Sequence, residues 1–119
     1  MDIFALRGAT TVECDSAELI DEAVAELMES IIKENSICEA DMVSVIFSQT
    51  KDLRKRNAAA ACRRAGFCSA VPLFCLQEAD IEGGLPYAIR VLITVKGDVK
   101  KQNMVYLRGA SNLRPDLKK

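Results

Sequence analysis

Hydrophobic and polar residues alternate most regularly between residues 88 and 95. The apolar members of this alternation are mostly β-branched: Ile89, Val91, Ile93 and Val95. Successive side chains of a strand point to opposite faces, so these residues predict one buried face and leave Arg90, Leu92 and Thr94 on the other. The pattern therefore predicts a β-strand with a permanent cation, Arg90, between two buried neighbours.

Similar patterns predict the remaining elements. The predicted strands are residues 3–6 (ending in a turn over 7–11), 42–48, 71–77, 88–95 and 104–107. Apolar residues at helical spacing predict a helix up to Ile32, capped by Asp15 or Ser16, and residues 58–65 predict a short helix closed by Gly66. A helical turn is predicted over residues 98–103.

The order of these predicted strands and helices along the chain predicts an α+β fold, in which helices cover one face of a mixed β-sheet. The other face needs a partner, for which a small oligomer is a natural solution.

Length and composition narrow the class of protein. The 119 residues predict a single domain over 1–119, and a net charge of −1 argues against a dedicated nucleic-acid binder. No apolar run reaches membrane-spanning length and no basic leader precedes one, which predicts an unexported, cytoplasmic protein without membrane contact. Five cysteines without a CxxC pair, and no histidine, argue against a zinc site and against Ser-His or Cys-His catalysis. An enzyme of this composition would work by binding and electrostatics.

Arg90 has two interpretations from the pattern alone. A charged strand residue usually faces water or forms a cross-strand salt bridge. Alternatively, Arg90 and Arg7, which follows the apolar Ile3–Leu6 segment, form a pocket for an anion.

Four motifs occur in a fixed order along the chain: Leu6–Thr11, Cys75–Glu78 followed by Gly83-Gly84-Leu85, Ile89-Arg90-Val91, and Val105-Tyr106-Leu107 followed by Leu113–Leu117. In this order and spacing the chain resembles the monofunctional, trimeric chorismate mutases of the Bacillus type (the AroH class). The resemblance covers nearly the whole chain, with a small deletion near residues 97–105.

The resemblance implies the rearrangement of chorismate to prephenate, a step of the shikimate pathway toward phenylalanine and tyrosine. This one-step pericyclic reaction uses no cofactor and no metal. The resemblance also implies a homotrimer whose sheets form a pseudo-barrel, with each active site shared between neighbouring subunits.

Individual roles follow from the same resemblance. Arg90 is expected at the ether oxygen, where negative charge grows as the C–O bond stretches. Glu78 and Cys75 are expected at the ring hydroxyl and the region of developing positive charge. Arg7 and Tyr106 are expected to hold a substrate carboxylate.

Four further residues are expected to bind substrate. Arg63 corresponds to a basic residue near the pocket mouth, and Leu113 and Arg114 belong to a segment that folds over the site. Phe74 is expected to line the pocket. The chain departs from the family pattern at three positions around the pocket mouth: Asn57, Ala60 and Phe74. Basic residues nearby are candidates to replace the positive charge lost there: Lys51, Arg54, Lys55 and Arg56. The alternative is that they form an ordinary charged loop that faces solvent.

Other interpretations remain open at this point. A non-catalytic trimeric sensor of an anionic metabolite and a small trimeric imine or enamine deaminase both fit an arginine that holds a carboxylate. Nucleic-acid binding through residues 51–64 is weak, because the stretch has no aromatic side chain for base stacking. Outside the resemblance, Glu78, Cys75, Tyr106 and Arg63 read as ordinary surface, core or sheet residues.

Overall fold

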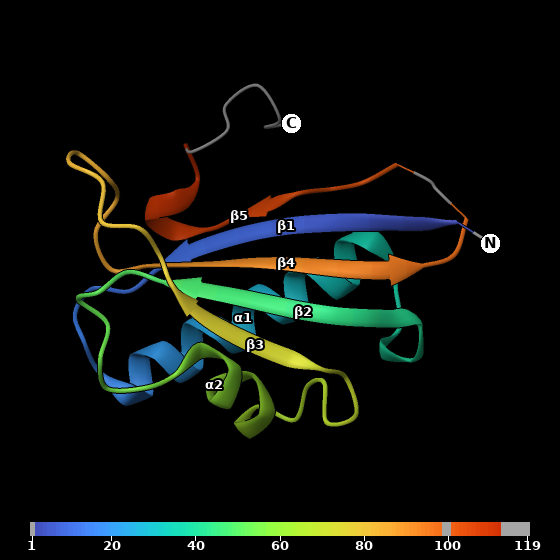
Figure 1. Cartoon of the computed structure of the whole chain (residues 1–119), viewed down its shortest axis with the longest axis horizontal. Helices are drawn as coiled ribbons and strands as arrows, with labels where there is room; N and C mark the ends of the chain where they lie inside the picture. Colours follow the sequence, from blue (N-terminus) through green and yellow to red (C-terminus); the bar gives the residue numbers. More distant parts are fainter. Residues whose placement is uncertain (1, 99–100, 113–119) are drawn as a thin grey trace.

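The protein is built on one five-stranded sheet with the strand order β3-β2-β4-β1-β5 (Figure 1). The computed structural model describes residues 2–98 and 101–112. Its strands are β1 (Ile3–Thr11), β2 (Met42–Gln49), β3 (Leu73–Gln77), β4 (Ala88–Lys96) and β5 (Val105–Tyr106). The central strand β4 runs antiparallel to β1 and β2, whereas β3 is parallel to β2 and β5 is parallel to β1. The predicted mixed sheet is confirmed.

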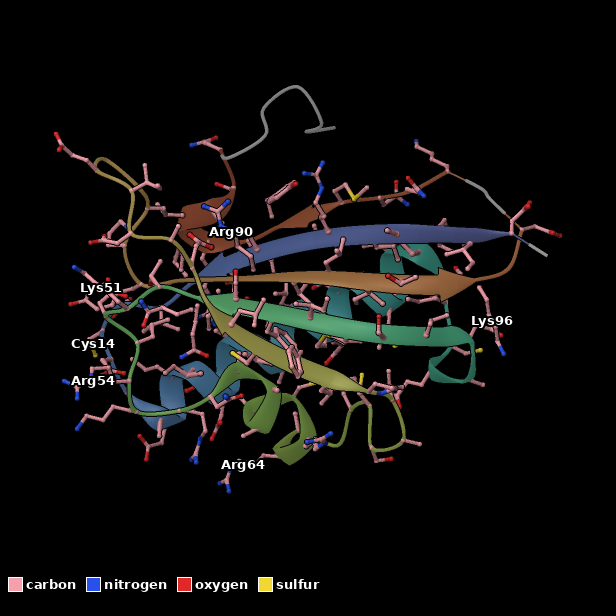
Figure 2. All side chains as sticks on the ribbon, in the orientation of Figure 1. Cys14, Lys51, Arg54, Arg64, Arg90 and Lys96 are labelled. Carbon is pink, nitrogen blue, oxygen red and sulfur yellow. The ribbon has the colours of Figure 1, made fainter. Side chains whose placement is uncertain are left out.

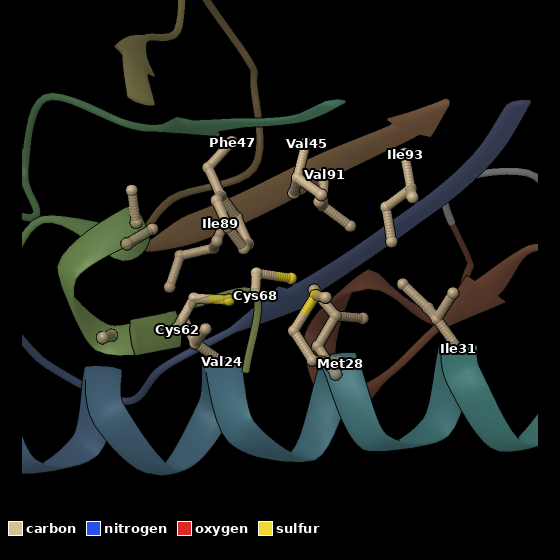
Figure 3. Close-up of a cluster of buried hydrophobic side chains, with 14 of the residues drawn as sticks. Val24, Met28, Ile31, Val45, Phe47, Cys62, Cys68, Ile89, Val91 and Ile93 are labelled. Carbon is tan, nitrogen blue, oxygen red and sulfur yellow. The ribbon is translucent and has the colours of Figure 1, made fainter. Parts of the chain in front are cut away.

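Two helices, α1 (Ala17–Asn35) and α2 (Ala58–Arg64), pack against each other and cover the same face of the sheet. Between these layers lies the hydrophobic core, in which Val24, Met28 and Ile31 of α1 meet side chains of β2 and β4 (Figure 3). The sheet contributes its buried alternate positions, including Val45, Phe47, Val91 and Ile93. The predicted α+β arrangement, with helices on one face, is therefore confirmed. None of the described helices is both long and apolar enough to cross a membrane.

The first strand is longer than the sequence predicted. The expected turn over residues 7–11 is wrong, because β1 continues in register with β4 as far as Thr11, which pairs with Ala88. Gly8 sits within this strand because α1 crosses it closely: a Cβ at Gly8 would lie 2.7 Å from Cδ1 of Ile31. The glycine thus serves helix-to-sheet contact and not a turn.

The helix boundaries follow the predicted signals. Ser16 is the N-cap of α1, and its Oγ accepts a hydrogen bond from the Leu19 backbone N–H at 3.3 Å. Asp15 instead accepts the backbone N–H groups of Arg54 and Lys55. Gly66, just after α2, has the positive φ of 89° that favours glycine at a helix end.

The connection from β4 to β5 is not helical where it is described. Asp98 and residues 101–103 have no helical hydrogen bonding, and residues 99–100 lie outside the described part of the chain. Asn103 explains the extended path, because its backbone N–H and C=O both bond to the Asn35 side chain at the end of α1. The predicted helical turn over 98–103 is therefore wrong for the described residues.

Candidate active site

Strand register brings several predicted site residues onto the face of the sheet that the helices leave open. Arg90 of β4 pairs with Ala9 of β1 on one side and with Ser48 of β2 on the other, and Ala9 pairs with Tyr106 of β5. Paired residues point to the same face, so Ser48, Arg90 and Tyr106 share one cross-strand row. Neighbouring strands are about 4.8 Å apart, which puts the Arg90 and Tyr106 backbones about 10 Å from each other.

Arg7 lies diagonally from Arg90 on the same open face. It pairs with Leu92, two residues along β4 from Arg90, and such diagonal neighbours are roughly 7–8 Å apart. Its backbone N–H donates to Sδ of Met104 at 3.1 Å, which ties β1 to the segment leading into β5. Arg7 and Tyr106, which are predicted to hold a substrate carboxylate, thus lie on the same face as Arg90, which is predicted at the ether oxygen.

Arg90 and Glu78 form an ion pair on this face. Arg90 Nε lies 2.9 Å from Oε1 of Glu78, and Ser48 Oγ donates to the same Oε1 at 3.1 Å. Arg90 Nε nevertheless has no well-aligned hydrogen-bond acceptor among the described residues, so the contact is chiefly electrostatic. The Glu78 backbone N–H bonds to the Gln49 carbonyl at 2.9 Å, which fixes the carboxylate just beyond the end of β3.

A pocket of about 550 Å³ opens beside this pair. Its lining contains Arg90 and Glu78 together with the 50–52 turn, residues 79–81 and Gly84–Pro86. The side chain of Arg90 is 43% exposed and that of Glu78 21% exposed, so both are accessible to a ligand. A planar cation with five N–H donors, next to a carboxylate, suits a small molecule that carries carboxylate and hydroxyl groups.

The remaining predicted residues lie elsewhere in the chain. Cys75 faces the helix layer, opposite to Arg90, because it pairs with the buried Phe47, and its Sγ donates to Gln49 Oε1 at 3.1 Å. Arg63 is exposed on α2, also in the helix layer. Phe74 is 65% exposed on the open face, but it belongs to β3 at the sheet edge. Within one chain these three residues do not join the Arg90 pocket. Arg7 and Tyr106 share the open face with Arg90 but are likewise not among the residues that line this pocket.

Leu113 and Arg114 lie outside the described residues. In the part of the chain that is described, no group of three or more His, Cys, Asp and Glu side chains is placed to hold a metal ion.

Two polar residues of β2 support the site and were missed by the sequence analysis. Ser48 contacts the Glu78 carboxylate, and its polar position within an apolar strand was the only signal. Gln49 accepts from the Ala58 backbone N–H at 2.8 Å and donates to the carbonyls of Leu53 and Arg56 at 3.0 Å. It thereby organises the 50–57 loop, a role with no signal in local sequence.

The open face also carries apolar side chains that no described element covers. They form a patch across β3, β2 and β4, with these exposed fractions: Phe74 65%, Leu76 49%, Leu92 39% and Ile46 37%. Isolated exposed apolar residues are normal, but a contiguous patch indicates a contact surface.

Comparison with known proteins identifies the relatives of this chain. The family model described as chorismate mutase type I matches residues 3–117. The curated chorismate mutase AroH of Bacillus subtilis is 43% identical over 119 residues, covering 98% of this chain and 94% of its own length. The AroH protein of Thermus thermophilus is 40% identical over 94% of this chain and 93% of its own length. A solved chorismate mutase structure from Clostridium thermocellum superposes with a TM-score of 0.85 at 38% identity, covering 90% of this chain and 96% of that one.

Proposed function

The chain belongs to the type I chorismate mutase family and converts chorismate to prephenate, and we propose that Arg90 and Glu78 lie at the centre of its active site. The observation that carries this assignment is the Arg90–Glu78 pair, 2.9 Å apart at the wall of the 550 Å³ pocket. Arg90 lies on β4, the central strand of the sheet, whose backbone is paired with β1 on one side and with β2 on the other. Its position in the pocket is therefore fixed by the sheet.

The reaction defines what Arg90 contributes. In one concerted step the ether C–O bond of chorismate breaks and a new C–C bond forms, with no proton transfer. The ether oxygen gains negative charge as its bond lengthens, so a fixed cation stabilises the transition state more than the bound substrate. The pocket must also hold the enolpyruvyl arm folded over the ring, which reduces the entropic part of the barrier.

The neighbouring residues take complementary roles. Arg7 and Tyr106, on the same face as Arg90, bind a substrate carboxylate through charge and through the phenol hydroxyl. Both contacts of Glu78 described above use Oε1, so Oε2 is free of them and accepts the ring hydroxyl of chorismate. Glu78 also limits rotation of the Arg90 guanidinium before substrate arrives.

We further propose that the protein is a homotrimer with active sites between subunits. Two observations support this assembly. The open face exposes the apolar patch formed by Ile46, Phe74, Leu76 and Leu92, which burial against another chain would stabilise. The predicted site residues also fall on two surfaces: Arg7, Glu78, Arg90 and Tyr106 on one, and Arg63 and Cys75 near the β3 edge and α2 on the other. A neighbouring subunit brings these two sets together.

The test of the site is chorismate consumption by purified protein, with prephenate identified as the product. We expect Arg90→Ala, and also Arg90→Lys, to reduce kcat about 100- to 1000-fold, because lysine keeps the charge but loses the guanidinium geometry. Arg108→Lys is the matched control: Arg108 Nε is likewise paired with a glutamate Oε1, at 3.1 Å, and its side chain is 36% exposed. Near wild-type turnover by Arg90→Lys would remove Arg90 from this role. Binding of chorismate without conversion would favour a sensor.

Light scattering tests the assembly. We expect a mass three times that of one chain at the concentration used for kinetics. A stable monomer with full activity would contradict both the trimer and the shared site.

We also propose that residues 1–119 act as one domain in the cytoplasm. All five cysteines are unpaired, as a reducing compartment requires.

A further inference from the structure

The Arg90 pocket contains a second cation, Lys51, that the proposed mechanism does not use. Arg90 and Lys51 are the two basic residues in the described lining of this pocket. Figure 2 shows both at the same end of the sheet, with Lys96 at the opposite end. Lys51 also lines a second hollow, of about 280 Å³, that contains Cys75. Lys51 therefore borders both hollows: the pocket that contains Arg90 and the one that contains Cys75.

The backbone on both sides of Lys51 is firmly held. The Thr50 backbone N–H donates to the Ala88 carbonyl at 3.1 Å, and Thr50 Oγ1 accepts from the Ala88 N–H at 3.0 Å. On the other side, Asp52 Oδ2 accepts the Tyr87 N–H at 3.0 Å. Tyr87 directly precedes β4 and Ala88 is its first residue. These contacts therefore fix the Lys51 backbone relative to Arg90, two residues further along the same strand.

Asp80 holds the Lys51 side chain at the pocket. Lys51 Nζ lies 2.7 Å from Asp80 Oδ2, and the side chains are 63% and 64% exposed. The hydrogen bond to Asp80 and the charge of that carboxylate raise the pKa of Lys51 above its ordinary value. Because both partners are largely exposed, solvent weakens the pair and a carboxylate in the pocket can displace Asp80.

The other carboxylates of the pocket are more firmly engaged. Glu78 is paired with Arg90 and Ser48, and Asp52 bonds to Thr50 Oγ1 and to the Tyr87 backbone. A ligand with two carboxylates entering this pocket thus meets one cation, Arg90, that already has a fixed anionic partner and a second, Lys51, whose partner is exchangeable.

We propose that Lys51 binds a carboxylate of the dianionic substrate, and that Asp80 competes with the substrate for Lys51 and so lowers affinity. This inference rests on the proposed function. It adds Lys51 to the substrate-binding residues and makes the 51–80 pair a determinant of KM, with little influence on the chemical step.

Steady-state kinetics on three variants tests the proposal. We expect Lys51→Ala to raise KM about tenfold with kcat within about twofold, because the contact is made equally in the ground and transition states. Asp80→Asn should lower KM about two- to threefold by freeing Lys51 from its competitor. Lys96→Ala, which removes the same charge at the far end of the sheet, is the matched control and should change KM less than twofold.

The double variant Lys51→Ala/Asp80→Asn separates attraction by Lys51 from repulsion by an unpaired Asp80. We expect its KM to remain several-fold above wild type and kcat/KM to depend less on salt. Full recovery of the wild-type KM would overturn the proposal, because it would mean that Asp80 alone causes the Lys51→Ala effect. An unchanged KM in Lys51→Ala, or an equal rise in Lys96→Ala, would also overturn it. In these outcomes the wild type still forms prephenate, whereas a wild type that forms none would refute the proposed function itself.

Discussion

Replacing Asn35 by alanine tests how β5 is held against the rest of the fold. Asn35 is the last residue of α1 and only 6% exposed. Its Nδ2 donates to the carbonyls of Asn103 at 2.9 Å and Ile31 at 3.0 Å, and its Oδ1 accepts the Asn103 N–H at 2.7 Å. Alanine removes all three hydrogen bonds and frees the segment that leads into Val105–Tyr106.

The expected cost follows from these contacts. Three hydrogen bonds at about 1 kcal/mol each, less roughly 0.5 kcal/mol for the better helix propensity of alanine, give a loss of about 2–3 kcal/mol. For a chain of this length that loss corresponds to a decrease in Tm of about 6–12 °C. The KM for chorismate should rise as well. The segment released from Asn35 contains Met104, which contacts the Arg7 backbone, and leads directly into Tyr106, so both proposed carboxylate-binding residues would be held less firmly.

Thermal unfolding at one fixed protein concentration measures this loss, because the stability of the proposed trimer would depend on concentration. Asn112→Ala, at an exposed asparagine, is the control and should change Tm by less than about 2 °C. Asn35→Asp keeps the shape and the acceptor but loses both donors, so it should destabilise the protein at least as much as alanine. An Asn35→Ala shift no larger than that of Asn112→Ala, or a stable Asn35→Asp protein, would refute the reasoning.

Three other substitutions or labelling results are expected. Gly8→Ala should destabilise the protein by about 1–3 kcal/mol in urea unfolding, because the added Cβ lies 2.7 Å from Cδ1 of Ile31; wild-type stability would show that α1 can move away. Asn57→Ala should cost about 1 kcal/mol, since the Asn57 side chain accepts the first free N–H groups of α2, and an unchanged urea midpoint would contradict that cap. A thiol reagent at pH 8 should label the exposed Cys14 before Cys62, because a hydrogen bond with Cys68 and burial raise the pKa of the Cys62 thiol; equally fast labelling of the folded protein would contradict this.

The sequence predicted most securely where pattern and burial coincide. The alternation at residues 88–95 predicted both the strand and the exposed face of Arg90, because a one-residue shift in a strand exchanges its buried and exposed sides. Gly66 marked the end of α2 for an equally local reason, its positive φ.

Prediction failed where the cause is distant in sequence. Gly8 looked like a turn residue, yet it lies in a strand because α1 passes close to it. Residues 101–103 are extended because of a contact with Asn35, 68 positions away from Asn103 in the chain. Nor could the motif order reveal that Cys75 faces the side of the sheet opposite to Arg90, since that depends on the pairing of Cys75 with Phe47.

The distribution of the predicted site residues over two surfaces of one chain has a genetic consequence. If each active site joins Arg90 of one subunit with Arg63 of its neighbour, chains lacking either arginine are defective alone but can complement each other when they assemble together. With random mixing of equal amounts, about one quarter of the interfaces unite two intact surfaces. Two inactive alleles expressed in one cell would then restore part of the activity, without recombination and without any change in either chain.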